Sequence, residues 1–151
     1  PLNLGLALND ARDYAGAIEA YQQSLSLDAA QPLTLVNLGI ALAARNDVNG
    51  AITAYRRAIA LNPREPLAYF NLAAVQAGQG APDSAITNFL RAAQLDPSLA
   101  VANFYASRLL LDAGNLPEAL KQIEVGLRFD PSATEARRAR EVIRQRLGRQ
   151  P

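Results

Sequence analysis

The chain has 151 residues, half of them hydrophobic, and 15 basic against 14 acidic side chains, which gives a formal net charge of +1. Its length suits a single domain, and its charge balance gives no global attraction to nucleic acid or acidic substrates. Histidine and cysteine are both absent, which excludes disulfides, thiol chemistry and the usual zinc and nucleophilic sites. No unbroken apolar run of about 18 residues is present that would span a membrane.

The same pattern of residues recurs along the chain at a constant spacing. An alanine marks each copy, a large apolar side chain follows four residues later, and a small side chain follows three residues after that. The alanines are Ala17, Ala51, Ala85 and Ala119, the large side chains are Tyr21, Tyr55, Phe89 and Ile123, and the small ones are Ser24, Ala58, Ala92 and Gly126. Four copies in register predict four units of the same local structure.

Each copy predicts a pair of helices joined by a turn. Pro32 and Pro66 suit the first position of a helix, because proline has a fixed φ and no donor. Small residues such as Gly39 and Ala51 are expected to let the two helices approach closely, with Tyr55 filling the space beside them. In chain order the copies cover residues 1–31, where the first helix is entered part way, then 32–65, 66–99 and 100–133.

The second helix of each copy is followed by a short polar residue. These residues are Asp28, Asn62, Asp96 and Asp130, and Pro63, Pro97 and Pro131 follow three of them. A short polar side chain at this place supports a turn, and proline stops a helix. The recurring carboxylates are therefore interpreted as turn residues, and no catalytic group, metal site or cofactor site is predicted.

Residues 134–151 break the pattern and predict a single helix. Ala136, Ala139, Ile143 and Leu147 form an apolar stripe at helical spacing. This segment carries six arginines against two glutamates, a charge of +4, whereas residues 1–133 carry nine basic and twelve acidic side chains, a charge of −3. We interpret it as a solvating helix that covers the fourth copy. Contact with nucleic acid or anionic lipid is the alternative, disfavoured because no aromatic residue interleaves the arginines for base stacking.

The whole pattern, with its period of about 34 residues, resembles the tetratricopeptide repeat family, in which Leu-Gly marks a first helix, Ala-x3-aromatic a second, and proline the end. The tryptophan expected near the start of each repeat is replaced by Leu35, Tyr69 and Asn103. The resemblance implies an all-α, right-handed solenoid of antiparallel helix hairpins that binds another protein and is not an enzyme. The first copy begins part way through its first helix, with no helix before it to cover its apolar residues, which suggests a longer natural chain. The alanine richness with a single lysine, Lys121, suggests a bacterial source.

The first helix of the second copy is apolar on two faces. Leu35, Leu38 and Leu42 lie on one face, whereas Leu33, Val36 and Ile40 lie on roughly the opposite face. In tetratricopeptide proteins this second face lines the concave groove, so the resemblance implies a peptide-binding groove here. The predicted groove residues are Asn3, Asn37, Asn71, Leu33, Val36, Ile40, Leu67, Phe70, Val101, Phe104, Tyr105 and Arg108.

Three asparagines in this set, Asn3, Asn37 and Asn71, stand at the same position of successive copies. An asparagine side chain both donates and accepts, so such a ladder can pair with the backbone of an extended segment. It resembles the asparagine ladders of O-linked GlcNAc transferase and of importin-type solenoids. A clamp for a terminal carboxylate is disfavoured, because Arg108 is the single cation among the groove positions.

Three other interpretations stand beside the peptide groove. The asparagines could bond a neighbouring helix, and the apolar face could be covered by a further helix. The chain could be the substrate-docking arm of a larger enzyme such as a glycosyltransferase. It could also be a structural module whose groove binds a second copy of itself. The expected partner is thus a protein or peptide segment, with self-association as an alternative, and no small-molecule substrate.

Overall fold

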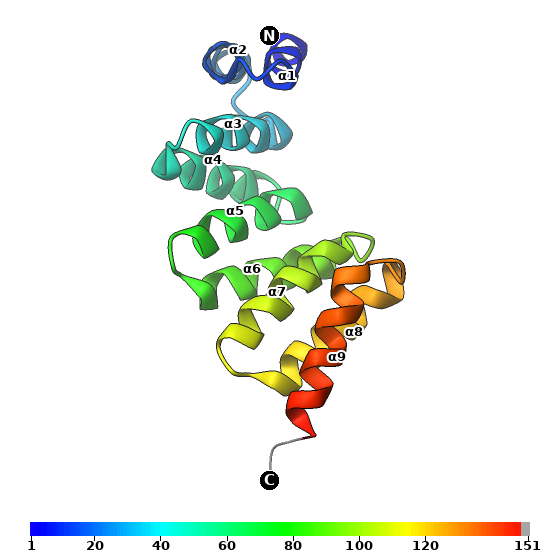
Figure 1. The fold of residues 1–151 in the computed structure, drawn as a ribbon. Coiled ribbons are helices and arrows are strands. Elements are labelled where there is room, and N and C mark those ends of the chain that lie inside the picture. The colour runs from blue at the N-terminus through cyan, green and yellow to red at the C-terminus, as the bar shows by residue number, and fades with distance from the viewer. Residues whose placement is uncertain (149–151) are drawn as a thin grey trace. The chain divides into compact units, whose positions relative to one another are not determined.

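The computed structural model describes residues 1–148, and within them the chain forms nine α-helices and no strand (Figure 1). In chain order the helices are α1 (Leu2–Asp10), α2 (Tyr14–Leu27), α3 (Pro32–Ala44), α4 (Val48–Leu61), α5 (Pro66–Gly78), α6 (Pro82–Leu95), α7 (Ala100–Asp112), α8 (Leu116–Phe129) and α9 (Thr134–Leu147). The predicted all-α fold of helix hairpins is confirmed.

The helices group into two compact units, and the boundary between them along the chain falls after Val75, within α5. In the unit Pro1–Val75, α1 packs against α2, α2 against α3, and α3 against α4. In the unit that begins at Gln76, α6 packs against α7, α7 against α8, and α8 against α9. The division into four repeats and a capping helix at 134–151 stays a prediction, and positions 149–151 of that segment lie outside the described part.

The turn inside each hairpin uses a side-chain cap in three of four places. Asp13 accepts a hydrogen bond from the Gly16 backbone N–H at 3.1 Å, and Asp47 does the same for Gly50 at 3.0 Å. Asn115 accepts one from the Glu118 N–H at 3.4 Å. These bonds satisfy N–H groups that have no partner inside the helix. At the fourth place Ala81 has no capping side chain, and Pro82 begins α6 instead.

The same turns each place one residue in the left-handed region of backbone space. The residues and φ angles are Arg12 at 60°, Asn46 at 63°, Gly80 at 73° and Gly114 at 77°. Glycine adopts this conformation without a steric cost, whereas a side chain such as that of Arg12 clashes with its own backbone. The turn geometry is therefore common to all four hairpins, although the residue that accommodates it varies.

The turns between hairpins have the form that the sequence predicts. In each one the side-chain oxygen of the residue after the second helix accepts a backbone N–H two residues further on. The pairs are Asp28 with Ala30 at 2.9 Å, Asn62 with Arg64 at 3.1 Å, Asp96 with Ser98 at 3.0 Å and Asp130 with Ser132 at 3.1 Å. The prediction that these residues support turns is confirmed, because their oxygen atoms are engaged with the local backbone.

The predicted close approach of helices at Gly39 is also confirmed. A Cβ atom at Gly39 would overlap the ring of Tyr55, which is 1% exposed. The same relation recurs between Gly5 and Tyr21, at the equivalent positions of the preceding hairpin. Around Tyr55, the buried side chains of Leu35, Ala51, Ala58, Ala68 and Leu72 form a core cluster of the first unit. Each glycine lets an aromatic ring of the second helix lie directly on the backbone of the first.

Candidate functional site

A cleft of about 530 Å³ lies between α7 and α9 in the second unit. Side chains of α7, α8, α9 and the turn before α9 line it. They are Val101, Phe104, Tyr105, Ser107, Arg108, Leu111, Ile123, Asp130, Ala133, Thr134, Glu135, Ala136, Ala139 and Ile143. Four predicted groove residues, Val101, Phe104, Tyr105 and Arg108, are therefore brought together in one cavity.

The floor of this cleft is apolar. Ile123 and Ile143 are buried, and Phe104 is half-buried. A Cβ atom at Gly126 would overlap the Phe104 ring, so this ring lies directly against the backbone of α8. On the α9 side Ala136 and Ala139 carry only methyl groups. The cleft exists because small residues of α9 stand opposite α7, and it offers space for an apolar side chain.

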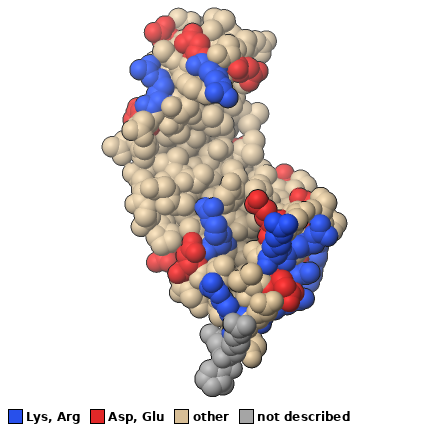
Figure 2. Space-filling model, in the orientation of Figure 1, with Lys and Arg blue, Asp and Glu red and all other residues tan. Residues whose placement is uncertain are grey.

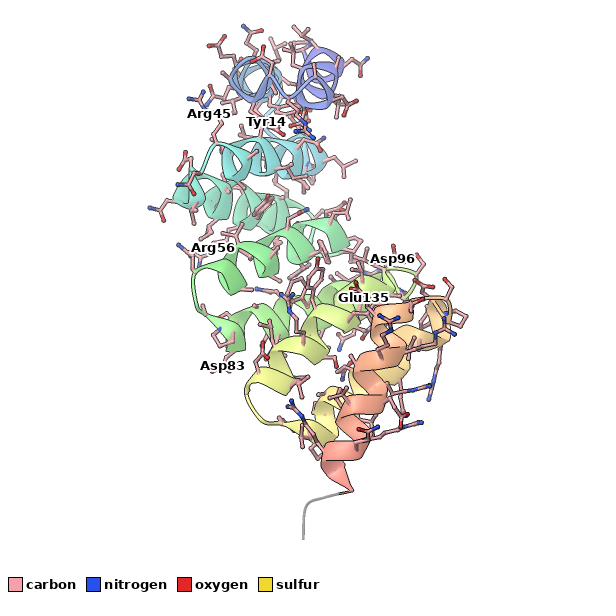
Figure 3. The ribbon with its side chains drawn as sticks, in the orientation of Figure 1. Tyr14, Arg45, Arg56, Asp83, Asp96 and Glu135 are labelled. Carbon is pink, nitrogen blue, oxygen red and sulfur yellow. The ribbon has the colours of Figure 1, made fainter. Side chains whose placement is uncertain are left out.

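The rim of the cleft is aromatic and charged. Tyr105 is 37% exposed and stacks on Phe89 with 5.3 Å between ring centroids and 16° between ring planes. The Arg108 guanidinium lies 5.3 Å from the centroid of the Tyr105 ring, which is a cation–π contact. Glu135 lies in the first turn of α9 (Figure 3) and also lines the cleft. A ligand here would meet an apolar floor edged by charges of both signs.

Beyond the cleft, α9 presents a basic surface. Figure 2 shows lysine and arginine side chains gathered over this helix, and Arg137, Arg138, Arg144 and Arg146 are exposed. Arg144 forms an ion pair with Glu124 of α8 at 2.5 Å. The predicted apolar stripe of α9 packs inward, with Ala136 and Ile143 buried. Arg149, which the sequence analysis counted in this segment, lies outside the described residues.

In the first unit, predicted groove residues lie on the surface of α1, α3 and the start of α5. Leu33 is 57% and Leu67 is 44% exposed, and Asn3 is exposed as well. Asn37, Ile40, Phe70 and Asn71 are half-buried. The Asn71 Nδ2 donates to the Leu67 carbonyl oxygen at 2.8 Å, so one amide hydrogen of this side chain bonds its own helix.

Val36 is an exception within the predicted groove. It is 2% exposed and belongs to the same core cluster as Ala68 and Leu72 of α5. At 100° per residue it lies about 60° around α3 from Leu33, on the side that α5 covers. Val36 therefore fills the core between two helices and offers no pocket to a ligand.

Sequence reasoning did not include the α9 residues that complete the cleft. Glu135, Ala136, Ala139 and Ile143 were interpreted only as parts of a solvating helix, although the apolar stripe of three of them indicated that this face contacts another element. Within residues 1–148 no group of histidine, cysteine or acidic residues could hold a metal ion. None of the described helices is long and apolar enough to cross a membrane.

Helix hairpins that recur at a constant spacing define a helical-repeat protein. Residues 41–80 match a family model described as TPR repeat, and residues 2–31 match one described as tetratricopeptide repeat. These two segments thus carry tetratricopeptide repeats, as the repeat pattern of the chain predicts. No curated protein matches the chain.

Solved structures share this fold at low sequence identity. A crystal structure of the MamA protein superposes with a TM-score of 0.86 at 22% identity, covering 97% of this chain and 80% of that one. YrrB, described as a TPR protein with an unusual peptide-binding site, gives 0.79 at 21% identity and covers 94% and 73%. The first TPR of Spaghetti (RPAP3), bound to an HSP90 peptide, gives 0.69 at 23% identity and covers 78% and 95%.

Proposed function

We propose that this chain is a protein-interaction module that binds an extended, partly apolar segment of another protein. The cleft between α7 and α9 carries the proposal. It combines an apolar floor at Phe104 and Ile143 with the partly exposed ring of Tyr105 and the cation of Arg108. Hot spots of protein interfaces lie in well-packed pockets and are enriched in aromatic and arginine side chains.

The surface of the first unit supports an extended occupant. Leu33 and Leu67 expose about half of their side chains, and Asn37 lies on the same face of α3 as Leu33. Asn71 retains its carbonyl oxygen and one amide hydrogen, since its single hydrogen bond within the described part of the chain is to Leu67. Asn37 and Asn71 would pair with the backbone of the bound segment, and the leucines would contact its side chains.

The structural relatives are consistent with this role. One is described as having a peptide-binding site and another was solved with a bound peptide. The proposal includes no catalytic step, because the recurring carboxylates support turns and, among the described residues that line the cleft, no nucleophile is paired with a base. A clamp for a terminal carboxylate is not proposed, since Arg108 is the single cation among the described residues that line the cleft.

A peptide-library binding screen tests the proposal. The wild-type chain is compared with two variants, Asn37→Ala/Asn71→Ala for the asparagines and Tyr105→Ala for the cleft. Leu33→Ser and Leu61→Ser form a matched pair, because both leucines are about half exposed in the first unit and Leu61 lies at the end of α4, away from the predicted groove. Circular dichroism checks that each variant folds.

We expect the wild type to select extended apolar segments. Each groove variant should bind the selected peptides with an affinity lower by about tenfold or more, as loss of a hot-spot side chain does. Leu61→Ser should bind them with the affinity of the wild type. Selection of the same peptides with equal affinity by Tyr105→Ala and by the double asparagine variant would refute the proposal. A wild type that selects no peptide but dimerises in light scattering would favour self-association instead.

A further inference from the structure

A second pocket, of about 260 Å³, lies among α6, α7 and α8. Leu90, Pro97, Asn103, Gln122, Val125 and Phe129 are among the residues that line it. At 100° per residue, Asn103 lies about 160° around α7 from Tyr105. This pocket is therefore on nearly the opposite side of α7 from Tyr105 and is separate from the proposed peptide site.

Asn103 is the unusual feature of this pocket. It is 3% exposed and lines the pocket, and its side-chain amide forms no hydrogen bond within residues 1–148. The amide is not among the fully enclosed unpaired polar groups of these residues, so it reaches solvent through the pocket. A polar group that has no protein partner but reaches solvent can bond a water molecule, and a ligand with a matching polar group can replace that water. The Asn103 amide is thus available to bond a ligand that enters the pocket.

The equivalent residues of the two preceding hairpins show what is different here. Leu35 is completely buried in the core, and the Tyr69 hydroxyl donates to the Pro63 carbonyl oxygen at 3.3 Å. Each of these larger side chains is accommodated by its surroundings. At Asn103 the side chain is short and polar, and a cavity remains beside it.

A second amide stands in the same wall. Gln122 is 8% exposed, and its Nε2 donates to the Glu118 Oε1 at 2.6 Å, which leaves the Gln122 carbonyl oxygen as an acceptor. The other walls are apolar, with Leu90 and Val125 half-buried and Phe129 53% exposed. The pocket therefore offers carbonyl acceptors next to apolar and aromatic surface.

We infer that this pocket binds the indole ring of a tryptophan from a partner protein. Indole is a flat apolar group with one N–H donor and no acceptor, which matches the Asn103 or Gln122 carbonyl oxygen. A cavity of about 150 Å³ accommodates benzene, so 260 Å³ leaves room for the second ring of indole. A phenyl ring would fill the same space but would bring no donor to either carbonyl oxygen.

Nuclear magnetic resonance titration with N-acetyl-tryptophanamide tests this inference. The readout is the side-chain amide signal of Asn103, with the signals of Gln122 and Phe129 as neighbours in the pocket. The chain contains no tryptophan, so indole fluorescence in a parallel titration comes entirely from the probe. N-acetyl-phenylalaninamide and N-acetyl-tyrosinamide are titrated in the same way.

We expect a saturable shift of the Asn103 amide signal with the tryptophan probe and binding about tenfold weaker for the phenylalanine probe, which lacks the donor. The variant Asn103→Leu carries the same residue as the equivalent position Leu35. It should bind the tryptophan probe about tenfold more weakly than the wild type does. Tyr105→Ala should bind it as the wild type does, because Tyr105 lies on the other side of α7.

Three results would overturn the inference. The Asn103 signal could fail to move, all three probes could bind equally, or Asn103→Leu could bind as tightly as the wild type. If Asn103→Leu does not fold by circular dichroism, Phe129→Ala replaces it, since this side chain is half exposed and its loss should weaken the probe without unfolding the chain. Unchanged binding by a folded Phe129→Ala would then count against the inference.

Discussion

Replacing Gly39 by alanine should destabilise this protein, although alanine is the better helix former. A Cβ atom at residue 39 would lie 2.8 Å from both Cδ1 and Cζ of Tyr55 and closer still to Cε1. These are ring carbons of a side chain that is 1% exposed within the core, so the ring has no free space to move into. The added methyl group must displace a helix or force the ring from its rotamer.

The magnitude follows from two opposing effects. Overpacking a well-packed core costs about 1–3 kcal/mol, and the upper end applies here because the overlap is with rigid ring atoms. Replacing glycine by alanine within a helix contributes about 1 kcal/mol in the other direction. We therefore expect Gly39→Ala to lower the free energy of unfolding by about 2 kcal/mol.

Urea unfolding followed by far-ultraviolet circular dichroism measures this change. Gly78→Ala is the matched control, because Gly78 is the last residue of α5 and no atom lies within 4 Å of an added Cβ. That variant should gain up to about 1 kcal/mol. In the Gly39→Ala background, Tyr55→Leu should cost less than it does in the wild type, since the overlap has gone. A Gly39→Ala chain as stable as the wild type would refute the reasoning.

Three further predictions concern pH, a buried hydrogen bond and a turn. Burial raises the pKa of the Tyr55 hydroxyl above that of a tyrosine in the unfolded chain. Above pH ~10 the unfolded chain therefore loses this proton before the folded chain does, and the free energy of unfolding should fall by up to about 1.4 kcal/mol per pH unit. Tyr55→Phe should reduce this fall of the unfolding free energy with pH, measured by urea unfolding at pH ~9–11. The same pH dependence in the variant and the wild type would contradict the prediction. Ser107→Ala should cost about 1 kcal/mol, because the buried Oγ donates to the Ala119 carbonyl at 2.7 Å, whereas exposed Ser26→Ala should cost little. Arg12→Gly should raise the midpoint of thermal unfolding and stabilise the folded chain by up to about 1 kcal/mol, because Arg12 has a φ of 60°, which glycine adopts more easily. A lower midpoint would count against this prediction.

Much of the local structure could be read from the spacing of residues. The constant period of the repeat placed the helix pairs, Pro32 and Pro66 begin α3 and α5, and the polar residues after the second helices form the expected turns. These features depend on residues that are close in the chain, or on one contact such as that of Gly39 with Tyr55, which repeats in register. Local rules of backbone geometry and hydrogen bonding are sufficient for them.

Burial at equivalent positions was decided only by the tertiary structure. Val36 and Phe104 hold the same place in the repeat, yet Val36 is buried in the core with Ala68 and Leu72, whereas Phe104 is half-buried and lines a cleft beside α9. Asn103 likewise borders a cavity where Leu35 is completely enclosed. Periodicity gives the direction in which a side chain points from its helix. Whether that side chain is covered depends on the size and distance of residues from another helix, which no local pattern contains.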